Sequence, residues 1–488
     1  MTESDLQRSA TPGLTATGAT RGAGSGLRAK LAIVVIVALV MSTLILLHVQ
    51  GVNGPWYWKW SWRRLGFWPL YPLMALASTP FWVAQWMYAR RPDRARRAVA
   101  MLMLATLALE LAAIACQPPG GLTRLRLIIE SAVNTSYYTA ATFLKDLAPA
   151  DWLAVFPQVL PDLMIHAKYK PPGLILFYYV LIRLFGVGPT AALIGGLIIA
   201  AAATLTVAAT YRLVRYFAAG DDAAFCAASF MAMTPSLVLF LAQFDQVYPA
   251  LAALLMLTWA VALERRRVTL AIAFGALLAS ALFLSYIFLV CGVFLAAFTL
   301  LFMYDHGRRG VWRAVTYSAI AVVTVVLLYL MLAAATYYDP IETTRVITQL
   351  QMADLIPLER PFPRHILFDL IDFALGSGWI SVVLAAFYLA HARGHVVRLF
   401  GQARAQRLVF LALLQIAVVA WAALLPGETA RLWMLMMPLL MAPVGLELAR
   451  WPMRYRVVVY ACLWLVLVAT CQNMTFIYMG PELDGPRH

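Results

Sequence analysis

Two lysines and a histidine stand just before a strongly apolar stretch, in "HAKYKPPGLILFYYVLIRLFG" (166–186). Lys170 precedes Pro171, a pair that favours an extended backbone at the lysine and a helix that begins at the prolines. Cations at a helix N-terminus oppose the helix dipole, so Lys168 and Lys170 favour an anion bound there, such as a lipid phosphate. Lysines that only snorkel to the membrane interface are the alternative. His166 is the weakest of the three candidates, since it is either a substrate contact or a loop residue without a role.

Carboxylates in the segment 117–170 form a second group of candidates. Glu130 lies in the apolar sequence "LIIESAV", where burial would raise the pKa of a carboxyl toward the range of a general base. An ordinary ion pair with Arg124 or Arg126 is the alternative. Asp151 lies in a more polar, proline-rich part of the segment, which favours a solvated loop position. The apolar residues of the segment recur at helical spacing and predict short amphipathic helices along the membrane surface.

Three further aspartates adjoin apolar runs. Asp245 lies between two such runs in "QFDQVYPAL", and an ionisable residue at membrane depth is costly enough to suggest a function. A polar cap between helices is the alternative. Asp369 and Asp372, in "ILFDLIDFAL", are three residues apart and so share one face of a helix. They could bind sugar hydroxyls or a cation, or pair with Arg360 or Arg364.

Glu428 and Arg431 stand three residues apart in "LLPGETARLWMLMMP", at the start of another apolar run. The forked, permanently charged guanidinium suits a phosphate oxyanion, and Glu428 would orient it. A Glu–Arg pair that only caps the helix is the alternative. The sequence has no P-loop, no GxGxxG after a strand and no HExxH, which disfavours cytosolic nucleotide chemistry and zinc hydrolysis.

The surrounding composition is that of a polytopic membrane protein. Of 488 residues, 63% are hydrophobic and only 12% are charged. Apolar runs of about 20 residues recur from 31 to 475 and predict one all-α transmembrane unit. Residues 1–30, rich in Thr, Ser, Gly and Ala, predict a disordered cytoplasmic tail, and 476–488 form an external tail. The net charge of +15 comes mostly from Arg clusters beside apolar runs, which indicates topology and lipid contacts and no nucleic-acid partner.

The Arg-rich loops predict the topology. "RRPDRARR" (90–97) should be cytoplasmic, as should "ERRR" (264–267) and three later clusters, including "DHGRRGVWR" (305–313). This places 117–170 outside and 264–267 inside. Four apolar runs lie between residues 171 and 264, so an odd number of them must cross the membrane. The run 173–186 has about 14 residues where a span needs roughly 20, so we expect it to enter the outer leaflet and return. About 13 crossings follow. In the alternative, all four of these runs cross the membrane, and a different pair of apolar runs is merged into one.

The arrangement resembles the GT-C class of integral-membrane glycosyltransferases, in particular the bacterial branch related to protein mannosyltransferases and to the aminoarabinose transferases of lipid A. Four stretches carry the resemblance: "IIESAVNTSYYTAA", "HAKYKPPG", "TPSLVLFLAQFDQVYPAL" and "GETARLW". The likeness covers roughly residues 117–265 and 426–445. Two departures stand out. Two extra helices (31–89) precede the catalytic loop, and the family's usual Asp near the start of that loop is missing.

In that family a polyprenyl-phosphate sugar is the donor, and an acidic residue of the first large external loop is the base. The resemblance therefore implies Glu130 as the base, with Asp245 and Asp151 as reserves. Cations at the junction between loop and helix hold the lipid phosphate; here these are Lys170, with Lys168 and Arg431 as helpers and Glu428 beside them. Further substrate contacts are expected from Tyr137, Tyr138, His166, Asp369 and Asp372.

The implied reaction moves a sugar to a hydroxyl of a glycan, lipid or protein acceptor, on the external or periplasmic face of the plasma (inner) membrane. A lipid monophosphate needs less charge neutralisation than a diphosphate, so Lys and Arg can replace a metal; a divalent cation is compatible with this chemistry but not required. The alternative is a transporter or lipid flippase for an envelope precursor. No internal repeat relates the two halves, and the polar residues gather on one face, which disfavours that alternative.

Overall fold

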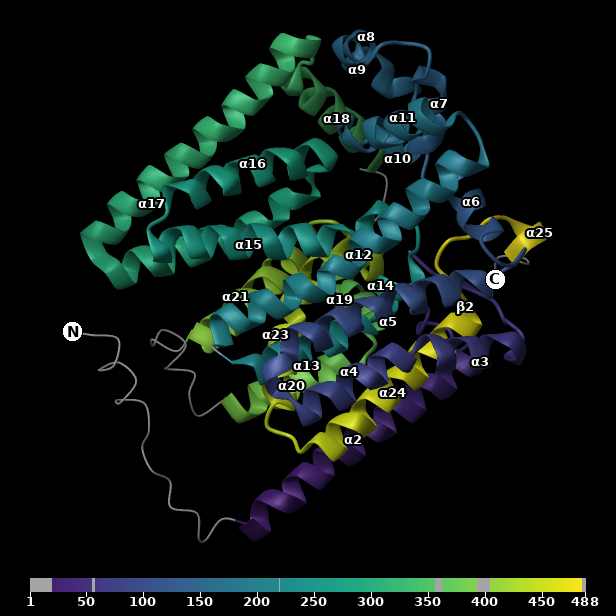
Figure 1. Ribbon diagram of the computed structural model, residues 1–488, viewed down its shortest axis with the longest axis vertical. Helices are drawn as coiled ribbons and strands as arrows, with labels where there is room; N and C mark the ends of the chain where they lie inside the picture. The colour runs from purple at the N-terminus through teal and green to yellow at the C-terminus, as the bar shows by residue number, and fades with distance from the viewer. Residues whose placement is uncertain (1–19, 55–57, 219, 356–361, 393–403, 485–488) are drawn as a thin grey trace.

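The computed structural model describes residues 20–54, 58–218, 220–355, 362–392 and 404–484, and nearly all of them belong to helices packed in one bundle (Figure 1). Within these ranges, eight helical stretches are long and apolar enough to cross a membrane. A ninth results if the bent pair α19 (Arg364–Ser377) and α20 (Ile380–Ala392) is one span. The prediction of an all-α bundle is confirmed, and these helices are candidates for membrane spans by their length and composition, whereas the count of about 13 crossings is not confirmed.

The eight stretches are built around α2 (Thr20–Leu46), α5 (Ala95–Ala115), α12 (Pro189–Ala218), α15 (Tyr248–Arg265), α17 (Gly292–Thr336), α21 (Arg404–Trp421), α23 (Met437–Leu448) and α24 (Met453–Asn473). Further helices are α3 (Phe67–Ala77), α4 (Thr79–Arg90), α13 (Asp221–Ala232), α14 (Pro235–Leu239), α16 (Val268–Leu284), α18 (Pro340–Leu355), α22 (Thr429–Leu432), which begins the stretch that contains α23, and α25 (Pro481–Asp484), which follows α24. The described residues also form the 3₁₀ helices η1 (Pro92–Arg94), η2 (Leu160–Asp162), η3 (Phe244–Gln246), η4 (Tyr286–Cys291) and η6 (Trp433–Met436).

The N-terminal part of the bundle differs from the sequence prediction in two places. Helix α2 begins at Thr20, so the predicted disordered tail 1–30 is helical over its last part; residues 1–19 lie outside the described residues. The apolar run 67–89 is not one helix but two, α3 and α4, which meet at Ser78. A proline stands in the first turn of α4, where its missing N–H favours a new helix start over a continuous helix.

At the predicted cytoplasmic loop 305–313, two helical parts of α17 meet at a kink. Helix α17 has 45 residues, more than twice the roughly 20 that one span needs. Its helical dihedral angles are interrupted at Gly307, where φ is 54° and ψ is −143°. A positive φ is readily adopted only by glycine, so Gly307 lets the helix bend without a separate loop.

The segment 117–170 folds into short helices, as its hydrophobic spacing predicts. These are α6 (Thr123–Glu130), α7 (Tyr137–Leu144), α8 (Pro149–Ala154), α9 (Phe156–Val159) and α10 (Ile165–Lys168). The next helix, α11 (Gly173–Phe185), has 13 residues, the short length on which its predicted return to the outer leaflet depends. Helix α11 packs on α7 and α12, which fixes the end of the segment against the bundle.

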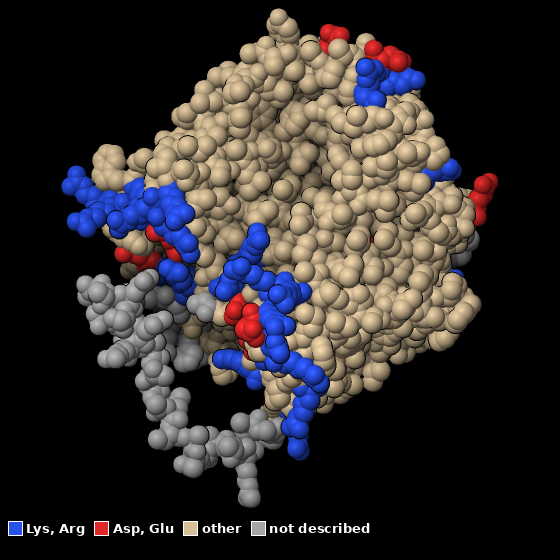
Figure 2. All heavy atoms as spheres, viewed as in Figure 1, with Lys and Arg blue, Asp and Glu red and all other residues tan. Residues whose placement is uncertain are grey.

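The two ends of the bundle differ in charge. Lys and Arg side chains gather at the left and lower part of the molecule in Figure 2, where Figure 1 places the bend of α17. At this end α15 finishes at Arg265, which is followed by Arg266 and Arg267; all three are exposed. Arg308 and Arg309 lie in the bend of α17. The other end of α15 begins at Tyr248, beside the candidate site.

Candidate active site

Four charged side chains from three distant parts of the chain meet at one end of the bundle. The Lys170 Nζ lies 3.7 Å from Oδ1 of Asp245, and the Arg431 Nε lies 3.8 Å from Oδ2 of the same carboxylate. The Arg431 Nη2 lies 2.5 Å from Oε2 of Glu428, so the predicted Glu–Arg pair is present. Lys170, Asp245, Glu428 and Arg431 are called the charged cluster below.

The cluster is assembled from helix starts. Lys170 lies between α10 and α11, and Asp245 lies in η3 directly before α15, which has a proline in its first turn. Arg431 lies in the four-residue helix α22, and Glu428 is its N-cap residue. Prolines are favoured in the first turn of a helix, so the sequence itself sets where α11 and α15 begin. These starts place the three segments at the same end of the bundle.

Two tyrosines surround the ammonium group of Lys170. Its Nζ donates a hydrogen bond of 3.2 Å to the Tyr248 hydroxyl, and it lies 5.8 Å and 5.2 Å from the ring centres of Tyr137 and Tyr248. Burial is the largest influence and would lower the pKa of Lys170, but the negative charge of Asp245, together with Tyr137 and Tyr248, outweighs it and raises the pKa, so the lysine stays protonated. Burial raises the pKa of Tyr137, and it also raises the pKa of Glu428 against the opposing charge of Arg431.

The charged cluster retains hydrogen-bonding capacity. Its two contacts to Asp245 are longer than a hydrogen bond, and neither Asp245 Oδ1 nor Arg431 Nε has a hydrogen-bond partner among the described residues. The cluster is also not sealed, since 19% of the Lys170 and Glu428 side chains and 13% of the Arg431 side chain are exposed. Buried polar atoms without a partner are rare in folded proteins, and an oxyanion placed here would bind both cations.

His166 belongs to the same site as an uncharged group. Burial, together with the positive charges of Arg431 and Lys170, lowers the pKa of His166 to about 3. At neutral pH His166 therefore adds no charge to the cluster. A neutral imidazole beside the cations can accept or donate one hydrogen bond to a substrate.

Two of the three predicted base candidates lie apart from the charged cluster. Glu130 Oε2 is 3.5 Å from Arg126 Nε, which is the ion-pair alternative, and Asp151 is exposed on α8. No ion pair or hydrogen bond joins either carboxylate to the cluster in the ranges that the structure covers. Of the predicted bases, only Asp245 stands between the cations.

The remaining residues of the segment divide in the same way. Tyr137 faces Lys170, whereas the Tyr138 hydroxyl donates to the Gly188 carbonyl at 3.1 Å and accepts from the Gly188 N–H at 2.7 Å. Tyr138 therefore ties α7 to the chain before α12. The Lys168 Nζ lies 5.6 Å from the centre of the Tyr169 ring.

Asp369 and Asp372 share one face of α19, as predicted, and both are buried. Asp372 accepts hydrogen bonds from the Ala430 N–H at 2.9 Å and from the Thr429 hydroxyl at 3.1 Å, and Asp369 accepts one from the Gly427 N–H at 3.3 Å. The pair thus holds the backbone that leads into Arg431. The predicted partner Arg364 is exposed, and Arg360 lies outside the described residues.

Sequence reasoning missed two members of this site. The Trp60 indole donates a hydrogen bond of 2.7 Å to Asp372 Oδ1, from a part of the chain that has no recognisable motif. Tyr248 could have been found, because it follows Asp245 by three residues at a helix start and so lies near it in space.

No group of three or more His, Cys, Asp or Glu residues in the described part of the chain is arranged to hold a metal ion. No protein-family model matches the chain, and no curated protein shows significant similarity to it. The function must therefore be inferred from the residues of the site and their arrangement.

Proposed function

We propose that the protein is a membrane-bound glycosyltransferase that transfers a sugar from a polyprenyl-phosphate donor to an acceptor hydroxyl. The observation that supports it best is the position of Asp245 between Lys170 and Arg431, in a partly open site with hydrogen-bonding capacity to spare. Two cations suit a departing phosphate, and a carboxylate beside them suits the proton of an attacking hydroxyl. The sequence resemblance to GT-C enzymes points to the same chemistry.

The charge asymmetry of the bundle supports an external or periplasmic location for the site. Helix α15 has 18 residues, about 27 Å at 1.5 Å per residue, and separates the charged cluster from the Arg-rich loop 264–267. Arg-rich loops stay on the cytoplasmic side. The cluster would then lie at the outer headgroup level, where the phosphate of a polyprenyl lipid is found.

Each member of the cluster has a role in this proposal. Lys170 and Arg431 bind the phosphate oxygens of the donor, and Glu428 orients the Arg431 fork. The phosphate draws both cations away from Asp245, which then accepts the proton of the acceptor hydroxyl. The hydroxyl oxygen bonds to the anomeric carbon as the bond between that carbon and the phosphate oxygen breaks. The polyprenyl phosphate leaves with one more negative charge, which the two cations stabilise.

The test uses purified protein in detergent and a panel of radiolabelled polyprenyl monophosphate sugars. The wild type should release labelled sugar from at least one donor, to an acceptor or to water. Lys170→Ala should weaken donor binding at least about tenfold, because it removes a charge-assisted contact. Lys59→Ala is the matched control, because Lys59 is exposed and its Nζ donates to Gln50, and it should bind the donor within a few-fold of the wild type. Absence of binding to every polyprenyl monophosphate, under conditions where the protein is folded, would exclude this function.

A transporter of an envelope precursor is the second candidate, and one observation favours it. Glu110 is fully buried in α5, and neither of its carboxyl oxygens has a hydrogen-bond partner among the described residues. Ionisable groups inside a membrane often mark transport pathways. Movement of a labelled lipid precursor across reconstituted vesicles, lost in Glu110→Gln and kept in Asp245→Asn, would support the transporter over the transferase.

A further inference from the structure

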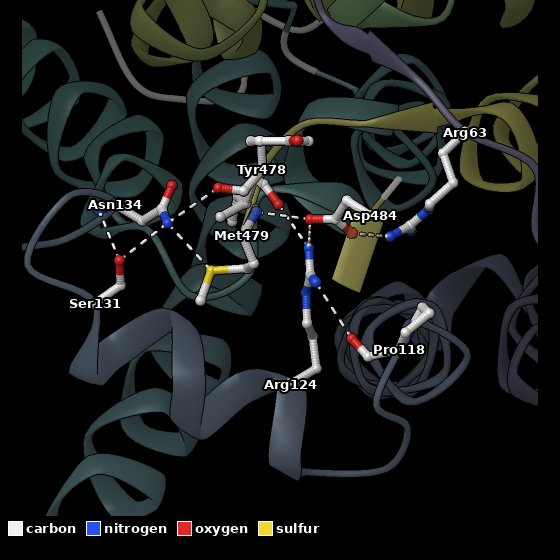
Figure 3. Close-up of polar contacts among 9 residues, drawn as sticks. Arg63, Pro118, Arg124, Ser131, Asn134, Tyr478, Met479 and Asp484 are labelled. Atoms are coloured by element: carbon white, nitrogen blue, oxygen red, sulfur yellow. Dashed lines mark hydrogen bonds and ion pairs between the residues drawn. The ribbon is translucent and has the colours of Figure 1, made fainter. Parts of the chain in front are cut away.

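The C-terminal segment, residues 474–484, lies at the same end of the bundle as the charged cluster and is fastened at its own end by a buried carboxylate. Asp484 Oδ1 accepts a hydrogen bond of 2.6 Å from Arg63 Nη1. Asp484 Oδ2 accepts from Arg124 Nη2 at 2.9 Å and from the Met479 N–H at 2.6 Å (Figure 3). All three charged side chains are buried, so the two guanidinium groups depend on Asp484 for their counter-charge.

The C-terminal segment also contacts the loop that leads into α7. Asn134 Nδ2 donates to the Tyr478 carbonyl at 3.2 Å and to the Ser131 hydroxyl at 3.0 Å (Figure 3). The Asn134 carbonyl in turn accepts a hydrogen bond of 3.0 Å from Gln243 Nε2. Gln243 is two residues before Asp245 and bonds to the backbone carbonyl of Asn134, so Asn134 links the segment to the stretch that carries the carboxylate.

A second route runs from the C-terminal segment to the same stretch. The ring of Phe476 packs on Phe240 with 5.0 Å between the ring centres, and on Trp60 with 4.9 Å. Phe240 precedes Asp245 on the same short stretch of chain. Trp60 donates a hydrogen bond to Asp372, which holds the backbone just before Arg431. These contacts therefore link the C-terminal segment to the stretch that carries Asp245 and, through Trp60 and Asp372, to the stretch that carries Arg431.

The loop held by Asn134 is coupled to the lysine as well. The Ser136 hydroxyl accepts a hydrogen bond of 2.8 Å from the Ala167 N–H, which lies three residues before Lys170. Tyr137, which faces Lys170, follows Ser136 directly. Displacement of this loop would therefore move both the lysine's backbone and its aromatic neighbour.

From these contacts we propose that the C-terminal segment braces the charged cluster, and that Asp484 is a positioning residue for Asp245 and for the loop 131–136. Removal of the Asp484 charge leaves Arg63 and Arg124 buried and uncompensated. The end of the segment then detaches, and the contacts through Asn134 and Phe476 loosen. The placement of the brace stands independently of the reaction; only its consequence for donor binding rests on the proposed function.

Hydrogen–deuterium exchange of the purified full chain tests the brace without any activity. Asp484→Asn should accelerate exchange about tenfold in 477–484, in 131–136 and in 240–246, because all three lose the same support. The control is Glu482→Gln, which removes an exposed carboxylate from the same short helix and should leave all three stretches unchanged. Faster exchange in 477–484 alone would overturn the proposal.

A second variant covers the outcome in which Asp484→Asn does not fold. Asn134→Ala removes the amide that joins the loop to Tyr478, and with it the hydrogen bond to Ser131 inside the loop. The decisive stretch is therefore 477–479, where exchange should accelerate; no change there would overturn the proposal. The functional measurement is steady-state kinetics with a polyprenyl monophosphate sugar as donor. Asp484→Asn should have a higher KM for the donor than Glu482→Gln, with a smaller change in kcat. If the wild type binds no such lipid, the proposed function fails and the exchange result still decides the brace.

Discussion

At the residue scale, the most informative feature is a carboxylate held between two cations at distances too long for hydrogen bonds. Asp245 in this state is stabilised as an anion and is a weak base. An arriving phosphate competes for Lys170 and Arg431, and its own negative charge makes Asp245 more basic. Under the proposed function, this competition couples donor binding to activation of the acceptor, so the donor should bind first.

Asp245→Asn tests that coupling. The amide is close in size to the carboxylate but cannot take a proton, so kcat should fall about 10²- to 10⁴-fold. Donor binding should stay within a few-fold of the wild type or become tighter, because the cations lose an internal competitor. Steady-state kinetics and equilibrium donor binding measure the two effects separately. Retained kcat in Asp245→Asn, with loss in Glu130→Gln, would move the base to Glu130.

His166 gives a prediction for pH. Its pKa is lowered from 6.5 to about 3 in the folded protein, so below pH 6.5 the unfolded chain takes up a proton that the folded chain refuses. The folded state therefore loses stability as the pH falls from 6.5 toward 3, by at most about 1.4 kcal/mol per pH unit for this group.

The corresponding measurement is the thermal midpoint of the wild type and of His166→Asn across this range. As the pH falls, the thermal midpoint of the wild type should decrease more than that of His166→Asn. The wild-type activity should show no histidine limb between about pH 5 and pH 8, where an unperturbed histidine titrates. A limb that disappears in His166→Asn would contradict the neutral assignment.

The sequence identified most of the charged residues of the site but not their grouping. Lys170, Asp245 and the Glu428–Arg431 pair were all candidates because charge beside an apolar run is costly and therefore conspicuous. Their meeting point depends on how α11, α15 and α22 pack, which no local pattern encodes. Glu130 attracted attention for its apolar neighbours, yet Arg126 one helical turn earlier already supplies its partner.

At the element scale, the short stretch before Arg431 is held on two sides. The Ala430 N–H donates to Asp372, and the Ala430 carbonyl accepts a hydrogen bond of 2.5 Å from the Ser236 hydroxyl. Gly376 in α19 lies against the same residue, with no room for a side chain. Helix α22 has only four residues and cannot hold Arg431 by itself, so contacts from α14 and α19 fix the position of this stretch.

Gly376→Ala tests how tightly this stretch is held. An added Cβ would lie 2.8 Å from Ala430 Cα and 2.9 Å from its carbonyl oxygen, closer than van der Waals contact. We expect destabilisation by about 1 to 3 kcal/mol and weaker donor binding, since Arg431 must shift. Gly292→Ala is the matched control, because nothing lies within 4 Å of the added Cβ there. Thermal unfolding and donor titration report the two effects, and equal midpoints for both variants would show that the stretch is loosely packed.

Element boundaries were the weakest part of the sequence prediction for a physical reason. Hydropathy measures whether a stretch prefers lipid, so it merges α3 and α4 into one run across the break at Ser78. It divides α17 at the polar residues around Gly307, and there the structure does have a kink between two helical parts. Composition predicts where the membrane is, whereas prolines and glycines decide where helices start and bend.

At the scale of the whole molecule, segments far apart in the chain close the bundle. Strand β1 (Ser61–Trp62) pairs antiparallel with β2 (Met474–Thr475), in the register Ser61 to Thr475 and Trp62 to Met474. Helices α2 and α24 also pack against each other. These contacts hold the C-terminal segment beside the charged cluster and define the end of the bundle opposite the Arg-rich loops.

Cysteine labelling tests the proposed orientation of this bundle. Val133→Cys, exposed in the loop 131–136, should react with a membrane-impermeant maleimide added to intact cells. Val268→Cys, exposed beside the Arg-rich loop 264–267, should react only after the membrane is opened. The parent chain measures the background from its five native cysteines, of which Cys226, Cys291 and Cys471 are buried. The reverse pattern would place the charged cluster in the cytoplasm.

The long sequence separation within the site has a consequence for biosynthesis. When a ribosome has inserted Lys170 and Asp245 into the membrane, Arg431 and Asp484 have not yet been made. A partly translated chain therefore presents one lysine and one carboxylate that neutralise each other, without the second cation or the brace. Under the proposed function, the ability to bind donor and transfer sugar should appear abruptly and late in synthesis, once the last helices dock.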